Sequence, residues 1–322
     1  MPGVGKIISA HVAASFRASF LNIRLGLVVG ICGAVPQLTA QDEEIFLGDM
    51  IISTGIIQLD FGRQLPDQVI RKDTLKDNLG RPNQEVRAFL SKLQGWQGRL
   101  ILRQRISTWI AAIFNTDGFS SWCYPGIDED ILYQADYYHE HCNEAVCIIC
   151  AQNTKPDSLV CDTISNATYA NLKCDEDHLV TRERSESIVS RSASSDNAAS
   201  SMVPRLHFGL IASSDIKSAQ HRDQIAAKEQ VIGFEMEGAG VWDNFPTIVI
   251  KGVCDYADSH INKKWQKYAA VAAAVCTNGI LENWRETDEI SNPFEDPNKA
   301  GVLPRYRDNR YQEVQHDPVS VL

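Results

Sequence analysis

The sequence predicts an α/β protein, built as a single three-layer domain in which helices flank a mixed, largely parallel central sheet. Two observations carry this prediction. Short apolar runs with the length of strands alternate with helical patterns along the chain, as they do in βαβ units. Two of these runs, Leu25–Ile31 and Thr247–Val253, are apolar on both faces, which is typical of strands covered on both sides in a parallel sheet.

The first half of the chain opens with a Gly-rich turn at Met1–Lys6, followed by a helical pattern in which Ile8, Val12 and Phe16 recur about every 3.6 residues. The turn lacks the Gly-x4-Gly-Lys-Ser/Thr pattern of a P-loop, so we do not expect it to bind ATP. The pattern then predicts strands at Leu25–Ile31 and Asp49–Ile57, and helices at Glu85–Leu93 and Arg99–Phe114.

The second half begins after an irregular stretch. Residues 117–203 show few periodic elements and include a Ser-rich piece at 185–201, which predicts an insert with a mobile loop. Beyond it we expect strands at Leu206–Ser213, Val231–Phe234 and Thr247–Val253, and helices at Arg222–Glu229 and Trp265–Trp284. We therefore assign residues 1–284 to one domain that contains the insert, and 285–322 to a disordered tail.

Composition and charge exclude several classes of protein. The 322 residues are 44% hydrophobic and 22% charged, which is ordinary for a globular domain with a sizeable core. The formal charge is 31 − 41 = −10, and such an acidic chain is a poor partner for a phosphate backbone, so we expect no nucleic-acid binding. No apolar run reaches the roughly 20 residues of a membrane span, and we expect no membrane association.

The nine cysteines are odd in number and show no scaffold-like spacing, and we find no secretory leader. Free thiols in a reducing compartment, and hence a cytoplasmic protein, are the prediction. One group could differ, because Cys142, Cys147 and Cys150 follow two histidines and include a Cys-x2-Cys spacing that suits Zn²⁺. Ordinary reduced cysteines are favoured over this alternative, since no second Cys-x2-Cys follows.

Three strand ends carry polar or Gly-rich residues: Gly30–Ala34, Glu235–Glu237 and Asp255–Asp258. Ligands of open α/β sheets bind beyond the carboxyl ends of strands, so we expect a site there. Asp255 follows an apolar strand, where partial removal from water suits a general acid. The alternative is that Asp255 is a turn or helix-capping residue.

The pair Glu235 and Glu237 flanks Met236, so both carboxylates point to the same side of an extended chain. Two carboxylates on one side are costly unless they bind a group that donates hydrogen bonds, and vicinal sugar hydroxyls fit this requirement. The alternative is an ordinary helix N-terminus, where the helix dipole favours acidic side chains.

Two segments, Val231–Asp243 and Lys251–His260, resemble the purine nucleoside phosphorylase and methylthioadenosine nucleosidase superfamily. The resemblance extends over Pro2–Trp284 and is greatest to fungal members, which are often fused to NACHT or ankyrin modules. It implies a single α/β domain that acts on a purine nucleoside and needs no cofactor. Because members often share sites across a dimer or hexamer, it also implies a homo-oligomer.

The resemblance also implies roles for the acidic residues. Glu237, with Glu235 beside it, would bind the ribose hydroxyls, and Met236 would pack on the sugar. Asp255 would protonate purine N7 as the glycosidic bond breaks. The chemistry agrees, because this cleavage builds positive charge on the sugar and negative charge on the base, and one carboxyl group stands ready for each. Asp255 and Glu237 are therefore the candidate catalytic residues.

The nucleophile and any bound anion are expected at a set of residues around the first Gly-rich strand end: Gly30, Cys32, Gly33, Lys251 and Ser213. Phosphorylases of the superfamily hold phosphate with an Arg and a Ser, where this chain has Val28 and Ile31. The missing charge-assisted donors favour water as the nucleophile, and therefore hydrolysis. Backbone N–H groups of the loop could still bind an anion, so a phosphorylase is the alternative.

Two departures from the resemblance bear on catalysis. Members of the superfamily begin with a strand that precedes the Pro-Gly-x-Gly-Lys turn, whereas this chain starts at the turn. Either the sequence is truncated or the protein has lost the usual first strand, and a missing first strand would leave a neighbouring strand edge unpaired. Lys251 stands where the nucleosidases have an Arg, and it cannot make a planar bidentate contact. These departures keep a third function open, a catalytically degraded nucleoside-binding or interaction module.

Overall fold

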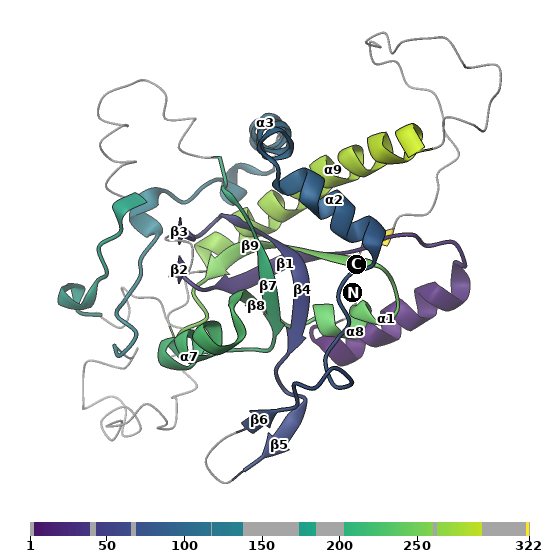
Figure 1. The fold of residues 1–322 in the computed structure, drawn as a ribbon. Coiled ribbons are helices and arrows are strands. Elements are labelled where there is room, and N and C mark those ends of the chain that lie inside the picture. The colour runs from purple at the N-terminus through teal and green to yellow at the C-terminus, as the bar shows by residue number, and fades with distance from the viewer. Residues whose placement is uncertain are drawn as a thin grey trace.

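A computed structural model describes residues 3–38, 43–65, 69–116, 118–137, 174–184, 203–259, 263–291 and 320–321. Its centre is a six-stranded sheet with the order β10-β1-β8-β7-β4-β9, in which β9 pairs again with β1 (Figure 1). The strands are β1 (Gly26–Ala34), β4 (Met50–Gln58), β7 (Leu206–Ser213), β8 (Val231–Glu235), β9 (Thr247–Asp255) and β10 (Ser320–Val321). The second pairing of β9 closes the sheet into a barrel.

The prediction of a mixed, largely parallel sheet is confirmed. The pairs β1/β9, β1/β10, β4/β7 and β7/β8 are parallel, while β1/β8 and β4/β9 are antiparallel. The three-layer arrangement is corrected, because a barrel has no open sheet between two layers of helices. Register shifts interrupt the pairing at Cys32/Gly33, Ser53/Gly55 and Leu210/Ile211. Irregularities of this kind bend and twist strands, which favours closure.

The expected unpaired strand edge is not confirmed. Within the described strands β1, β4, β7, β8 and β9 each have a partner on both sides, so the ring has no open edge. A closed ring satisfies the backbone hydrogen bonds that an edge strand would leave unpaired.

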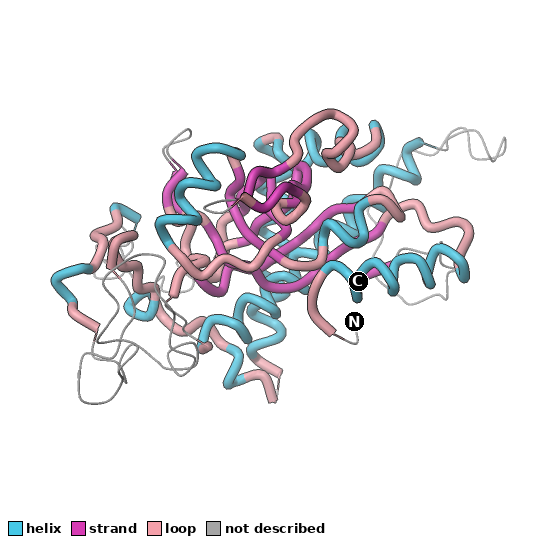
Figure 2. Tube along the Cα trace, turned by 90° about the horizontal axis from the view of Figure 1, so that it is seen from below, coloured by secondary structure: helices cyan, strands magenta, loops and turns pink. Residues whose placement is uncertain are grey.

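The helices lie around the barrel (Figure 2). They are α1 (Lys6–Ser19), α2 (Gln84–Gln94), α3 (Trp96–Phe114), α7 (Ala219–Glu229), α8 (Gly238–Trp242) and α9 (Lys264–Ser291). Asn83 caps α2 by accepting a hydrogen bond from Val86 N at 2.9 Å. Asn is a favoured residue at this position, so the cap is consistent with the helix predicted here. Helix α9 packs along β1 and β9, and α1 packs on α8.

Several small elements were not predicted. Strands β2 (Gln37–Leu38) and β3 (Glu43–Glu44) form one hairpin, and β5 (Gly62–Gln64) and β6 (Val69–Arg71) form another. The described flanks of the expected insert contain the 3-10 turns η1 (Ser120–Trp122), η2 (Ile127–Glu129) and η4 (Glu176–His178), and an isolated antiparallel bridge joins Tyr133 to Leu179. Helix α9 continues to Ser291, past residue 285 where the tail was expected to start, and residues 292–319 lie outside the described part.

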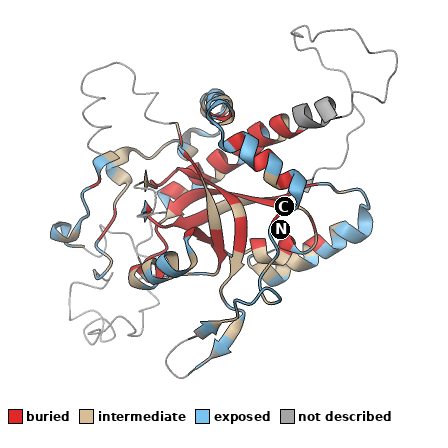
Figure 3. Cartoon of the chain, viewed as in Figure 1, coloured by how far each residue is buried: buried red, intermediate tan, exposed pale blue. Residues whose placement is uncertain are grey.

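Buried residues make up most of the central strands, while the helices carry both buried and exposed residues (Figure 3). One apolar cluster includes Val28, Val249 and Trp265, and a second, under α2, α3 and α9, includes Leu27, Leu90 and Ile250. Val28 and Leu27 are adjacent in β1 and belong to different clusters, because successive side chains of a strand point to opposite faces. This explains why β1 is apolar on both faces.

Candidate active site

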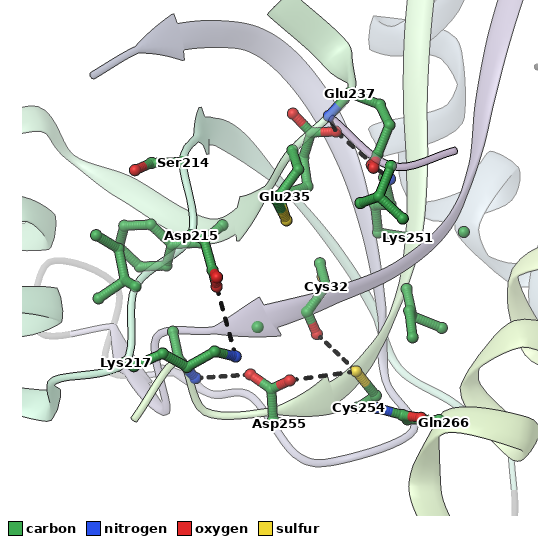
Figure 4. Close-up of a pocket in the computed structure, with 18 of the residues that line it drawn as sticks. Cys32, Ser214, Asp215, Lys217, Glu235, Glu237, Lys251, Cys254, Asp255 and Gln266 are labelled. Carbon is green, nitrogen blue, oxygen red and sulfur yellow. Dashed lines mark hydrogen bonds and ion pairs between the residues drawn. The ribbon is translucent and has the colours of Figure 1, made fainter. Parts of the chain in front are cut away.

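A cavity of about 420 Å³ lies beside the C-terminal ends of β1, β8 and β9 (Figure 4). The three strand ends meet because Gly33 pairs with Phe234 of β8 and, across a register shift, with Asp255 of β9. A Cβ atom at Gly33 would lie 2.6 Å from Asp255 Oδ1, so only glycine permits this approach. All three strand ends singled out in the sequence contribute to the cavity wall.

Asp255 ends β9 and carries one wall of the cavity. Its Oδ1 accepts a hydrogen bond from Ala257 N at 2.9 Å, and its Oδ2 lies 3.4 Å from the Cys254 thiol. Burial raises the pKa of Cys254 far above its usual value, so the thiol is neutral and can donate weakly to this oxygen. Asp255 is thus the turn residue of the alternative interpretation and also faces the cavity.

Glu237 stands at the N-terminus of α8, and its carboxylate is held from two sides. Gly5 N donates to Oε1 at 3.2 Å, and Lys251 Nζ lies 2.8 Å from Oε2. Burial raises the pKa of Glu237, but the Lys251 ammonium and the Gly5 hydrogen bond lower it more, so the net shift is downward. Glu237 is therefore ionised at neutral pH and has lone pairs left for further donors.

Lys251 is 2% exposed and bridges the two glutamates, since its Nζ also lies 3.4 Å from Glu235 Oε2. Burial lowers the pKa of Lys251, but Glu235 and Glu237 raise it more, so it remains a cation. Glu235 and Glu237 thus share one side of the chain, as expected. Opposite charges at this distance keep Lys251 and Glu237 ionised in a buried site.

Glu235 has less hydrogen-bonding capacity left for a ligand than Glu237 has. It is 3% exposed, and its carboxylate accepts from Glu237 N at 2.9 Å and from Gly238 N at 2.8 Å. This is the helix N-terminus foreseen as the alternative for the acidic pair. Glu235 lines the cavity but is occupied with the α8 backbone and Lys251, whereas Met236, 37% exposed, projects to the cavity wall.

The residues expected around the nucleophile do not all meet. Gly30, Cys32, Gly33 and Lys251 line the cavity, together with Ile31. Ser213 instead lines a neighbouring cavity of about 280 Å³, and its buried hydroxyl has no hydrogen-bond partner in the described part of the chain. The two cavities share walls at Met236 and Ser214.

Sequence reasoning missed Lys217, which lines the cavity from the loop after β7. Its Nζ lies 3.5 Å from Asp215 Oδ1. Burial lowers the pKa of Lys217, but the charges of Asp255 and Asp215 raise it more, so an ammonium group stands near Asp255. Only its position just beyond a strand end could have indicated it. Gly3 and Val4 of the N-terminal turn were also missed as wall residues.

The described residues hold no group of three or more His, Cys, Asp or Glu side chains arranged for a metal ion. Cys142, Cys147 and Cys150, the alternative zinc ligands, lie outside the described residues. Among the described helices, none combines the length and the apolar character that crossing a bilayer would need.

Comparison with known sequences gives one informative relative and no matching family model. A nucleotide-binding leucine-rich repeat (NLR)-like protein from Hyaloscypha variabilis is 29% identical over 289 residues, which are 87% of this chain and 24% of that protein. The chain thus spans about a quarter of the length of the curated relative that it matches.

The chain is also similar to solved nucleosidases and to a futalosine hydrolase. A 5′-methylthioadenosine/S-adenosylhomocysteine nucleosidase from Helicobacter pylori is 13% identical, with a TM-score of 0.43 and coverage of 87% of this chain and 76% of that one. Futalosine hydrolase from the same organism is 12% identical, with a TM-score of 0.40 over 87% and 76% of the two chains. The Neisseria meningitidis nucleosidase, in complex with methylthio-immucillin-A, is 14% identical, with a TM-score of 0.37 over 87% and 78%. These are distant likenesses, so the function has to be argued from the residues of the cavity.

Proposed function

We propose that the chain hydrolyses the N-glycosidic bond of a purine nucleoside or nucleotide. The observation that carries the proposal is that Asp255 and Glu237 line the same cavity, one near each end of it (Figure 4). A volume of about 420 Å³ falls within the range of cavities that bind small molecules. If the two carboxyl groups had faced different cavities, one nucleoside could not have reached both.

The Glu237 end of the cavity suits the sugar. Its carboxylate is ionised, and Lys251 and Gly5 hold it in place from one side. A carboxylate can accept about four hydrogen bonds, so two vicinal hydroxyl groups can still be accommodated. Its negative charge also stabilises the positive charge that develops on the sugar as the bond breaks. Met236 beside it offers an apolar surface for the ribose ring.

The Asp255 end suits the base. In the proposed step the bond between C1′ and the purine nitrogen breaks, and its electron pair leaves with the base. The Asp255 carboxyl group gives its proton to the base, and the oxygen of water bonds to C1′. The proton released by that water restores Asp255 through solvent, so the sum is nucleoside plus water to sugar plus base. The nearby ammonium of Lys217 stabilises the Asp255 carboxylate that proton transfer leaves behind.

Water is favoured over phosphate as the nucleophile. Ile31 lines the cavity but has neither a charge nor a hydroxyl group. The positive charge of Lys251 is already balanced by the carboxylates of Glu235 and Glu237. A phosphate dianion needs charge-assisted donors that are not otherwise engaged. The second candidate is a phosphorylase. It is supported by Lys217, because this cation lines the cavity and could hold a phosphate there.

A third candidate is a nucleoside-binding module without catalysis. It is supported by the NLR-like relative, of which this chain matches 24%, since such a piece could serve as a sensor within a longer protein. For all three candidates we further propose a homo-oligomer in the cytoplasm, with no nucleic acid or membrane as partner.

Release of free base separates the three candidates. The full chain is incubated with adenosine, inosine, methylthioadenosine or ATP, with and without phosphate, and the base is quantified by chromatography. Hydrolysis predicts release that does not depend on phosphate and a free sugar as co-product. Release that requires phosphate would replace hydrolysis by phosphorolysis, and binding without release from any substrate would leave the binding module.

A further inference from the structure

The turn that carries Asp255 is held from behind by two buried arginines. Arg222 of α7 donates from Nη1 to the backbone carbonyl of Tyr256 at 2.8 Å. Arg182 donates from its own Nη1 to the Tyr256 hydroxyl. Both arginine side chains are almost completely buried, so the residue that follows Asp255 is fixed through both its backbone and its side chain.

The turn needs such support. Ala257 has φ 50°, in the left-handed region that is costly for residues with a Cβ atom. The N–H group of the same residue donates to Asp255 Oδ1 at 2.9 Å. A residue in a sparsely populated conformation keeps it only when its surroundings enforce it. The orientation of the Asp255 carboxyl group therefore depends on what holds residues 256 and 257.

The hydroxyl group of Tyr256 lies in a closed set of polar contacts. It donates to Asp130 Oδ1 and accepts from Arg182, and Asp130 Oδ2 also accepts from Leu47 N at 2.9 Å. The other two nitrogens of Arg182 are paired as well: Nη2 donates to the carbonyls of Ile45 at 2.6 Å and Pro36 at 3.2 Å, and Nε donates to Glu44 Oε1 at 3.4 Å. Each of these groups is buried and paired, so removal of one leaves the others with unmet hydrogen-bonding capacity.

Asp130 and Arg182 come from the two segments that flank the undescribed stretch 138–173. The segments pair with each other, since Val180 N donates to Leu132 O and Gln134 N donates to His178 O, both at 2.9 Å. One clasp, formed by Asp130 and Arg182, thus fastens both segments to the turn that bears Asp255.

We propose that Tyr256, clasped by Asp130 and Arg182, is a positioning residue that fixes the Asp255 carboxyl group in the cavity. It acts through the backbone of the turn and not on the substrate. This inference rests on the proposed role of Asp255 for its catalytic consequence, whereas its structural part can be measured without any activity.

The structural part is tested on the full chain by the rate at which an alkylating reagent labels Cys254, read peptide by peptide with mass spectrometry. The Cys254 thiol lies against Asp255 at the cavity wall and is 3% exposed, so its labelling is slow while the turn is closed and speeds up when the turn opens. Cys276 lies on α9 and is buried in the other apolar cluster, so it reports opening of the whole fold. Tyr256→Phe should raise Cys254 labelling roughly tenfold, the factor that corresponds to one ordinary hydrogen bond, and leave Cys276 labelling unchanged.

Two further variants sharpen the test. Arg182→Met should act like Tyr256→Phe, and Arg182→Lys should restore only part of the protection, because one ammonium cannot reproduce the fork. Arg71→Met is the matched control, since it removes another largely buried arginine that pairs with Glu229 and does not line the cavity. It should leave Cys254 labelling as in the wild type.

The outcomes separate this inference from the proposed function. Unchanged Cys254 labelling in Tyr256→Phe, or an equal rise at Cys254 and Cys276, would overturn it. If the wild type releases base, Tyr256→Phe should lower kcat roughly tenfold with KM within about twofold, and wild-type kcat beside raised labelling would also overturn it. If the wild type releases no base, the proposed function fails, while selective labelling of Cys254 still supports the clasp.

Discussion

Two carboxylates of this protein illustrate two uses of a buried negative charge. Asp49 lies at the start of β4 in a closed cluster with Arg184, His207 and Glu43, and Glu237 lies at the wall of the cavity. Both have a pKa held below the usual range by neighbouring cations and hydrogen bonds that outweigh burial. The two sites therefore differ in the number of their partners and not in their charge.

Asp49 has no acceptor capacity left. It accepts from Phe46 N and Arg205 N, from His207 Nε2, and from two nitrogens of Arg184. A carboxylate offers about four lone-pair positions, so five donors saturate it. Among the described residues, Glu237 accepts from Gly5 N and Lys251 Nζ and, more weakly, from the Met236 backbone N–H, and its remaining capacity faces the cavity. A saturated carboxylate holds the fold together, and a half-used one can bind a ligand.

The largest effect is expected from the closed cluster. Asp49→Asn removes the charge that balances Arg184 and His207 in a site where Asp49 is 1% exposed. Leaving buried cations without their partner should lower the free energy of unfolding by about 3–5 kcal/mol. Urea unfolding measures the loss, with Asp73→Asn, an exposed loop residue, as the control. A loss as small as that of the control would mean that saturation does not distinguish Asp49 from surface carboxylates.

The next effect concerns the cavity and should leave stability almost intact. Asp255→Asn keeps the shape of the side chain but removes the proton donor, so cleavage should fall by about 10² or more while nucleoside binding persists. Single-turnover base release and equilibrium binding measure the two quantities separately. Turnover equal to that of the wild type would remove Asp255 from its proposed role.

Features that depend on local sequence patterns could be predicted, whereas features that depend on contacts between distant residues could not. The strands and helices were predictable, because apolar runs and helical periodicity report local burial, as at Thr247–Val253. The strand ends that meet at the cavity were predictable as well, since ligands collect at the carboxyl ends of strands. Closure of the barrel was not, because it depends on the pairing of β9 with β1, which join residues more than 200 positions apart.

The closed cluster and the clasp were invisible for a similar reason. Arg182 and Arg184 lie within the irregular insert, which shows no periodic pattern, and only the folded chain brings them to Asp130 and Asp49. Glu235 and Glu237 look equivalent in the sequence, and their difference depends on where the α8 backbone N–H groups point. Spacing predicts which side a residue occupies but not which partners it meets there.

A smaller effect on cleavage should show whether Glu237 binds the ribose hydroxyl groups or only forms an ion pair with Lys251. Glu237→Gln keeps the shape but weakens hydrogen bonds to the ribose hydroxyls, so kcat/KM should fall roughly tenfold to a hundredfold. A nucleoside that lacks the 2′ and 3′ hydroxyl groups should be a poor substrate of the wild type, and the substitution should then cost little more. Comparison of the two substrates in the two proteins isolates the hydroxyl contact. An equal loss with both substrates would contradict binding of the hydroxyls by Glu237.

The smallest effect is a dependence on pH that only the closed cluster should show. Burial lowers the pKa of His207, but its contacts with Asp49 and Glu43 raise it more, so its pKa lies above the usual 6.5. The folded chain then holds this proton to higher pH than the unfolded chain does. The stabilisation is complete below about pH 6.5 and is lost as pH rises through the folded value.

Urea midpoints between pH 6 and 9 should therefore fall as pH rises, and His207→Gln should flatten that slope. Glu237 provides the contrast, because its pKa is lowered from 4.5 and its contribution is lost only as pH falls below that value. Glu237→Gln should thus leave the slope between pH 6 and 9 unchanged. If His207→Gln kept the full slope, the proton held between Asp49 and Glu43 would not contribute to stability, and the closed cluster would depend on Arg184 alone.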